Sequence, residues 1–184
     1  MKFNVHAGHT KSGTIGSGAK SLIDESVETR KVAKELTRLL REKGHTVYTC
    51  TNDKAVSERD NLQKIVAKCN AHKVDLDVSI HFNSGAKDVK GNGKSCGTEV
   101  WICSGGSSKK KTCATKVCKN IAKLGYTNRG VKVSDNLYVL NHTLSPAILV
   151  ECCFVDDKDD VTLYHKARGN YKAIAKAIAD AIGG

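Results

Sequence analysis

The sequence predicts an α/β fold with a twisted, mostly parallel sheet of about six strands and helices on both faces. Short runs of apolar, β-branched residues alternate along the chain with longer segments whose apolar residues recur at helical spacing. Three of the apolar runs, at residues 2–5, 78–80 and 147–150, lead into histidine or glutamate. The carboxyl ends of parallel strands meet at one edge of a sheet, where open α/β sheets bind their ligands. The pattern therefore predicts one functional site at that edge.

The order of the strands and helices follows from these runs and from capping residues. We expect strands over residues 2–5, 46–50, 77–81, 97–103, 138–140 and 147–151. We expect helices over residues 24–43, after a cap at Ser57, between a turn at residues 105–108 and Leu124, and after a cap at Asn170. Residues 84–97 are rich in Gly, Lys, Ser and Asn and form the longest expected loop. No internal repeat is visible, so we expect one domain over residues 1–184.

Length and charge limit the classes of protein to which the chain can belong. Its 184 residues are enough for one domain with a full core, and its net charge is +11. Such a charge favours polyanionic partners, whether nucleic acid, an acidic membrane or an anionic wall polymer, without choosing among them. No apolar run approaches the roughly 18 residues that a membrane-spanning helix needs, so we expect no membrane span. Met1 leads into a strand-like segment without the pattern of a signal peptide, so none is expected.

The chain has eight cysteines, and none of them forms a Cys-x-x-Cys pair. A structural zinc cluster is therefore not expected. Cys69 and Cys118 lie at helix-core spacing and Cys103 within a strand pattern. We interpret the cysteines as buried thiols that pack as small apolar residues. Many thiols without an export signal indicate synthesis in a reducing compartment.

Two histidines lie at expected strand ends, His9 shortly after the first strand and His81 at the end of the third. Catalytic zinc commonly takes three protein ligands from His and Asp or Glu and leaves a fourth position for water. The carboxylate has to come from the segment where the glycine-rich loop enters the first helix, which holds Asp24, Glu25 and Glu28. Spacing alone does not separate these three acids.

Four segments occur in an order that is typical of one known family: Gly8-His9, residues 22–25 at a helix start, residues 79–83, and residues 150–155. Together they resemble the zinc-dependent N-acetylmuramoyl-L-alanine amidases, which include the catalytic domains of many bacterial autolysins and phage endolysins. The resemblance covers nearly the whole chain, and four motifs in one order are far more specific than any one of them. It extends to Arg59, Asn70, residues 97–101 and residues 128–130.

The resemblance implies a role for each site residue. His9, Glu25 and His81 match the ligands of one Zn²⁺ per chain, and Glu151 matches the catalytic glutamate. Glu25 is favoured over its acidic neighbours because the apolar pattern of the following helix is in register with the family only for Glu25. One departure is His6, since the family often has Asp three residues before the first zinc histidine. We interpret His6 as a strand-end histidine that is hydrogen-bonded locally.

Other polar residues complete the expected site and surface. His142, in the loop before the last strand, is a further candidate for the crevice. Lys87, Lys90 and Lys94 of the long loop are the expected contacts to anionic wall polymers. The three lysines at residues 109–111 are expected in a solvated loop or first helical turn, because cations are unfavourable at a helix N-terminus. They lack interleaved aromatic residues, so we expect no nucleic-acid partner.

The function that the resemblance implies is hydrolysis of the amide between the lactyl group of muramic acid and L-alanine of the stem peptide of peptidoglycan. Such an enzyme would lyse bacterial cell walls. The alternatives are a zinc peptidase acting on the stem peptide, and a basic module that binds wall polymer or nucleic acid without catalysis. An open set of metal ligands argues against the binding module. We expect an enzyme made in the host cytoplasm that acts on the wall after release, with a separate wall-binding module after residue 184.

Overall fold

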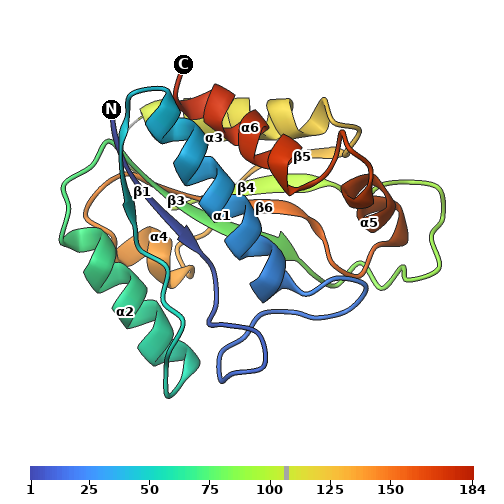
Figure 1. Ribbon diagram of the computed structural model, residues 1–184, viewed down its shortest axis with the longest axis horizontal. Helices are drawn as coiled ribbons and strands as arrows, with labels where there is room; N and C mark the ends of the chain where they lie inside the picture. Colours follow the sequence, from blue (N-terminus) through green and yellow to red (C-terminus); the bar gives the residue numbers. More distant parts are fainter. Residues whose placement is uncertain (106–107) are drawn as a thin grey trace.

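The computed structural model describes residues 1–105 and 108–184, and its strands form one six-stranded sheet (Figure 1). The strands are β1 (Lys2–Ala7), β2 (Thr46–Thr49), β3 (Leu76–Asn83), β4 (Thr98–Ile102), β5 (Asn128–Val133) and β6 (Ala147–Phe154). Their order across the sheet is β2-β1-β3-β6-β4-β5. The neighbouring strands β2, β1, β3 and β6 are parallel to one another. The strand β4 runs antiparallel to β6 and pairs in parallel with β5. The prediction of a mostly parallel sheet is confirmed.

Four of the helices follow a residue whose side chain accepts hydrogen bonds from free backbone N–H groups of the first turn. The helices are α1 (Glu25–Glu42), α2 (Glu58–Asn70), α3 (Ser108–Ala122), α4 (Tyr138–His142), α5 (Lys158–His165) and α6 (Tyr171–Ile182). Ser57 accepts a hydrogen bond from the N–H of Asp60, and Asn170 accepts hydrogen bonds from two N–H groups at the start of α6. Both predicted caps are therefore confirmed.

The helices α1, α6 and α3 cover one face of the sheet, with α6 between the other two (Figure 1). Successive residues of a strand point to opposite faces. Val78 and Ile80 of β3 point to this face, are fully buried, and pack in one core with Leu36 of α1 and Ile178 of α6. This core is almost entirely apolar.

The helices α2 and α4 cover the opposite face, which is more polar. Asn4, His6, Asp77 and Ser79 are all at most 1% exposed and lie on this side of β1 and β3. Asn4 Nδ2 donates to Asp77 Oδ1 at 2.6 Å and to the carbonyl of Cys69 in α2 at 2.9 Å. Helices therefore cover both faces, as the sequence predicts.

The predicted strand over residues 138–140 is wrong, because these residues form the start of α4. A short apolar run fits a strand or a buried helical turn equally well, and tertiary contacts decide between them. The side-chain amide of Asn141 donates to the carbonyl of Asp135 and holds the turn in place. The remaining strand is instead β5, an edge strand in which charged residues interrupt the apolar pattern. The helix α5 was not predicted either.

The start of α3 differs from the expectation in one respect. The predicted turn at residues 105–108 includes residues 106–107, which lie outside the described residues. The lysines at 109–111 are in the first turn of α3, but Lys110 is buried and its Nζ donates to Cys103 Sγ at 3.0 Å.

The cysteines are free thiols, and five of them are buried, as expected for small apolar residues. In the part of the chain that the structure describes, no helix is both long and apolar enough to cross a membrane.

Candidate functional site

The candidate site lies where the carboxyl ends of β1, β3 and β6 meet. His81 pairs with Glu151 across β3 and β6, and Glu151 pairs with Glu99 across β6 and β4. Paired residues on neighbouring strands point to the same face of the sheet, about 5 Å apart. Because β4 runs in the opposite direction, its amino end reaches the same edge. Three acid–base side chains therefore stand side by side across the sheet.

His9, Glu25 and His81 come together from the loop after β1, the start of α1 and the end of β3. One potential ligand atom from each lies within 4.8 Å of the others. Glu25 Oε1 is 3.3 Å from His9 Nε2 and 3.1 Å from His81 Nδ1. Among the described residues, no other group of three or more His, Cys, Asp or Glu side chains is arranged in this way. Two imidazole nitrogens and one carboxylate oxygen are a donor set that fits a divalent metal ion.

Two glycines make room for this cluster. A Cβ atom on Gly8 would lie 2.2 Å from Cε1 of His81, and a Cβ atom on Gly18 would lie 2.4 Å from Oε2 of Glu25. Real Cβ atoms do not approach other atoms so closely, so a side chain at either position would displace a member of the cluster. The glycine-rich loop after β1 is therefore a requirement of the packing around these three side chains.

The structure shows which of the three acids near the start of α1 lies beside the histidines, a choice that sequence spacing did not make. Asp24 caps α1, accepting from the N–H of Val27, and its other oxygen accepts from Ser12 Oγ. Glu28 accepts from the hydroxyl of Tyr164 at 2.6 Å and lies away from the histidines. Of the three acids, Glu25 alone lies beside His9 and His81.

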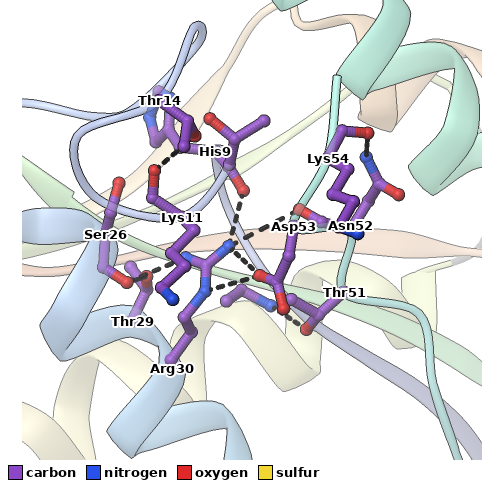
Figure 2. A network of polar contacts seen from close by, with 12 residues as sticks. His9, Lys11, Thr14, Ser26, Thr29, Arg30, Thr51, Asn52, Asp53 and Lys54 are labelled. Carbon is purple, nitrogen blue, oxygen red and sulfur yellow. Dashed lines mark hydrogen bonds and ion pairs between the residues drawn. The ribbon is translucent and has the colours of Figure 1, made fainter.

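The backbone of His9 is held in an uncommon conformation by Arg30 of α1 (Figure 2). His9 has φ of 61°, in the left-handed region that residues other than glycine rarely adopt. Arg30 Nη2 donates to the carbonyl of His9 at 3.1 Å, and its Nη1 donates to the carbonyl of Ser26 at 2.8 Å. Its Nε and Nη2 both donate to the carboxylate of Asp53. Sequence reasoning missed Arg30, because nothing in a helical pattern distinguishes it from a surface arginine.

Electrostatics keep Glu25 in the ionised form that a metal requires of a carboxylate ligand. Burial acts to raise the pKa of Glu25, but hydrogen bonds and charge from His81 and His9 outweigh it and hold the pKa well below its usual range. Burial acts to lower the pKa of His9, but its hydrogen bond to Glu25 and the charge of that carboxylate raise it overall. Glu25 is therefore ionised and able to act as a ligand.

Glu151 has the opposite character. Its Oε2 is buried and has no hydrogen-bond partner among the described residues. Burial, followed by the negative charges of Glu25 and Glu99, raises the pKa of Glu151 well above the usual range. Buried carboxyl groups with raised pKa values are typical general acid–base groups in active sites.

Two other histidines lie outside the cluster. His6 is fully buried, and neither ring nitrogen has a well-aligned hydrogen-bond partner among the described residues, although the backbone of the adjacent Ala7 interacts with the ring. Burial and the charge of His81 lower the pKa of His6 to about 3, which keeps the ring neutral. His142 does not line the crevice, because it lies at the opposite edge of the sheet. There its ring stacks on Tyr138 and its carbonyl accepts from Asn70.

A hollow of about 230 Å³ opens beside Glu151. The residues that line it are Asn83, Glu99, Trp101, Ser134, Leu137 and Glu151. Glu99 Oε1 accepts from Asn83 Nδ2 at 2.9 Å and from Trp101 Nε1 at 3.1 Å. Glu99 Oε2 accepts from Arg129 Nε at 2.7 Å. Sequence reasoning gave Glu99 and Arg129 no role, although both lie in segments that carry the family resemblance.

Solved structures share this fold. The catalytic domain of the CD27L endolysin, which targets Clostridia difficile, matches with a TM-score of 0.82 and 27% identity over 99% of this chain and 96% of that chain. Cwp6 from Clostridium difficile matches with a TM-score of 0.82 and 32% identity over 98% of this chain and 28% of that chain. The fold is thus that of a class of α/β catalytic domains.

Sequence comparison assigns the family. An uncharacterised protein of Clostridium perfringens is 36% identical over 99% of this chain and 51% of that protein. The endolysin of Bacillus phage SPP1 is 31% identical over 95% of this chain and 65% of that protein. The chain thus spans about half to two thirds of the length of these relatives. A family model described as N-acetylmuramoyl-L-alanine amidase matches residues 4–183, and the chain belongs to this family.

Proposed function

We propose that the chain is a zinc-dependent N-acetylmuramoyl-L-alanine amidase that cuts the amide between the lactyl group of muramic acid and L-alanine of the stem peptide. The observation that carries this proposal is the His9, Glu25 and His81 cluster beside Glu151, in a chain of the amidase family. Residues 1–184 act in this proposal as one catalytic domain, with peptidoglycan as substrate.

The ligand set supports one zinc ion per chain. Two imidazole nitrogens and a carboxylate oxygen are common ligands of catalytic zinc. The side chains of His9 and His81 remain 26% and 15% exposed, so the site is open toward a substrate. When bound, zinc polarises a carbonyl group and lowers the pKa of a water ligand to about 7.

Glu151 supplies the proton transfer. Burial and the neighbouring carboxylates raise its pKa, which favours a carboxyl group that can accept a proton and return it. As a base, its carboxylate takes a proton from the attacking water, and as an acid it then delivers that proton to the leaving nitrogen of L-alanine. The products are a lactyl carboxylate on the sugar and a free amine on the peptide, so the atoms of one water molecule are fully accounted for.

The positive charge supports binding to the wall. Lys87, Lys90 and Lys94 are exposed on the loop between β3 and β4. In this proposal they help to hold the domain on anionic wall polymers, and added salt weakens this binding because it screens exposed charges. The enzyme acts at the cell wall after release from the cell in which it is made.

Mass spectrometry of digested, purified peptidoglycan tests the proposal. The expected products carry a new lactyl carboxylate and a new L-alanine amine. Cleavage between amino acids of the stem peptide would instead support a peptidase, and an unchanged wall would support a binding module. Metal analysis provides the second arm: the native protein should hold one zinc per chain, and His81→Ala should lose it. Zinc content unchanged in His81→Ala would remove His81 from the ligand set.

A further inference from the structure

We propose that Arg129 forms a carboxylate-binding subsite on the peptide side of the bond that is cleaved. In this proposal the enzyme recognises an anionic group on the residue that follows L-alanine. The inference rests on the proposed function and adds to it the part of the substrate that is recognised beyond the reacting amide. Four observations support it.

The first observation is that Arg129 is fixed in place. Its Nε donates to Glu99 Oε2 at 2.7 Å, and Glu99 is only 3% exposed. Asn83 and Trp101 hold the other oxygen of that carboxylate. The guanidinium also lies 5.0 Å from the centre of the Phe154 ring. An arginine that is already ordered loses little side-chain freedom when it binds an anion.

The second observation is that the outer end of the guanidinium remains available. The Arg129 side chain is 37% exposed. Among the described residues, its Nη groups donate one hydrogen bond, at 3.6 Å to the sulfur of Cys96, which is a weak acceptor. The planar end of an arginine donates two parallel hydrogen bonds to a carboxylate. Glu99 therefore orients the fork toward solvent without occupying it.

The third observation is the order of the groups along the edge of the sheet. His9 and His81 lie at β1 and β3, Glu151 at β6, Glu99 at β4 and Arg129 at β5. Glu151 has to reach the leaving nitrogen in order to protonate it. The amine side of the substrate, which is the peptide, therefore extends from Glu151 toward β4 and β5. The sugar side extends the other way.

The fourth observation is that the reach is suitable. Neighbouring strands lie about 4.7–4.9 Å apart, so Arg129 begins two strands beyond Glu151, and its bond to Glu99 draws it back toward the site. An extended peptide spans about 3.3–3.6 Å per residue. A carboxylate on the residue after L-alanine therefore comes within reach of the guanidinium. The hollow beside Glu151 and Glu99 gives the chain of the peptide room to pass.

The test compares two synthetic substrates that differ by one charge. Both are N-acetylmuramoyl-L-alanyl-D-glutamate with the γ-carboxylate blocked as a methylamide, one with a free α-carboxylate and one with an α-carboxamide. For Arg129→Ala we expect kcat/KM to fall about 10- to 100-fold on the carboxylate, as for the loss of a charged hydrogen bond, and less than about 3-fold on the carboxamide. Arg129→Lys should recover only part of the loss, because lysine lacks the planar fork.

The controls separate recognition from folding. Lys116→Ala removes one exposed positive charge from α3 and should leave both substrates unaffected. A merely structural role of Arg129 would lower the rates on both substrates by the same factor and would lower the thermal midpoint. Calorimetry with Glu151→Gln protein should show the same preference for the carboxylate in equilibrium binding, and Arg129→Ala in that background should abolish the preference.

The outcomes distinguish this inference from the proposed function. If the native protein cleaves both substrates and Arg129→Ala affects them equally, the inference fails and the proposed function stands. If the native protein cleaves neither substrate, both fail. A preference for the carboxylate that disappears in Arg129→Ala supports both.

Discussion

Both faces of the sheet are buried, yet they are built from opposite kinds of side chain. On the face that α1 and α6 cover, β3 presents Val78 and Ile80, which are fully buried in an apolar core. On the face that α2 and α4 cover, the same strand presents Asp77 and Ser79, which are at most 1% exposed. Alternation along one strand thus assigns packing to one face and polar chemistry to the other.

The polar face carries a cost in stability. Asn4 Oδ1, Asp77 Oδ2 and Ser79 Oγ are buried without a hydrogen-bond partner among the described residues. Burying such groups unpaired is unfavourable. The row of β3 continues to the edge of the sheet as His81, which pairs with Glu151 of β6. The difference teaches that the apolar face stabilises a scaffold on which the polar face can hold reactive groups. Each prediction below separates the two contributions.

The largest expected effect is on catalysis. Glu151→Gln preserves size and shape but cannot relay a proton. We expect hydrolysis to fall by at least about 10²- to 10⁴-fold, the usual contribution of general acid–base catalysis. Zinc content and thermal midpoint should remain at native values or above. These three measurements on one variant are decisive, since near-native cleavage would show that Glu151 is not the proton-transfer group.

Next in size is a contrast between adjacent residues of β3. Ile80→Ala leaves a cavity in the apolar core and should lower the free energy of unfolding by about 2–5 kcal/mol. Ser79→Ala removes an unpaired buried hydroxyl and should keep the free energy of unfolding within about 1 kcal/mol of the native value. Denaturant unfolding at constant pH measures both. Equal losses of unfolding free energy at the two positions would contradict the view that the apolar face contributes most of the stability.

Arg30 tests whether a helix on the apolar face also supports the site. Arg30→Ala frees the His9 backbone to leave its uncommon conformation, so zinc affinity should fall about 10- to 100-fold, as for other groups that orient metal ligands. Chelator competition measures this affinity. Arg38→Ala is the matched control on α1, because Arg38 pairs with Glu35 and Glu42 of the same helix. A fall in affinity of the same size in Arg38→Ala would mean that helix stability, and not the His9 contact, is responsible.

The last expected effect is a pH dependence of stability. Burial raises the pKa of Asp77 to about 6, from a usual value of 3.8. Between these values the folded protein keeps a proton that the unfolded chain has released. The contribution of Asp77 to folding stability therefore falls as pH rises from 3.8 to 6, by up to about 3 kcal/mol. Asp77→Asn should remove this contribution, so that its stability curve diverges from that of the native protein as pH rises, whereas Asp75→Asn, at an exposed position, should follow the native curve. Urea unfolding from pH 4 to pH 7 compares them, and parallel curves for Asp77→Asn and native protein would refute the assignment.

Much of the fold and of the candidate site can be predicted from the sequence. Particular residues show which parts cannot. Capping by Ser57 and Asn170 and the apolar runs of β1, β3 and β6 are local signals, so those elements are placed correctly. The segment at residues 138–140 carries no local signal that separates strand from helix, and contacts made after folding decide it. For the site, family motifs indicate His9, Glu25 and His81. Arg30 and Glu99 act through partners far away in sequence, which no spacing rule reveals.

The reversal of direction between β6 and β4 has a consequence for how such a domain can diversify. All of β4, α3 and β5 lies in one uninterrupted stretch, residues 98–133, while the His9, Glu25, His81 and Glu151 side chains come from outside it. Recombination at two points, before β4 and after β5, therefore exchanges one flank of the crevice as a cassette. Such an exchange can change which part of the substrate is recognised on that flank without changing His9, Glu25, His81 or Glu151.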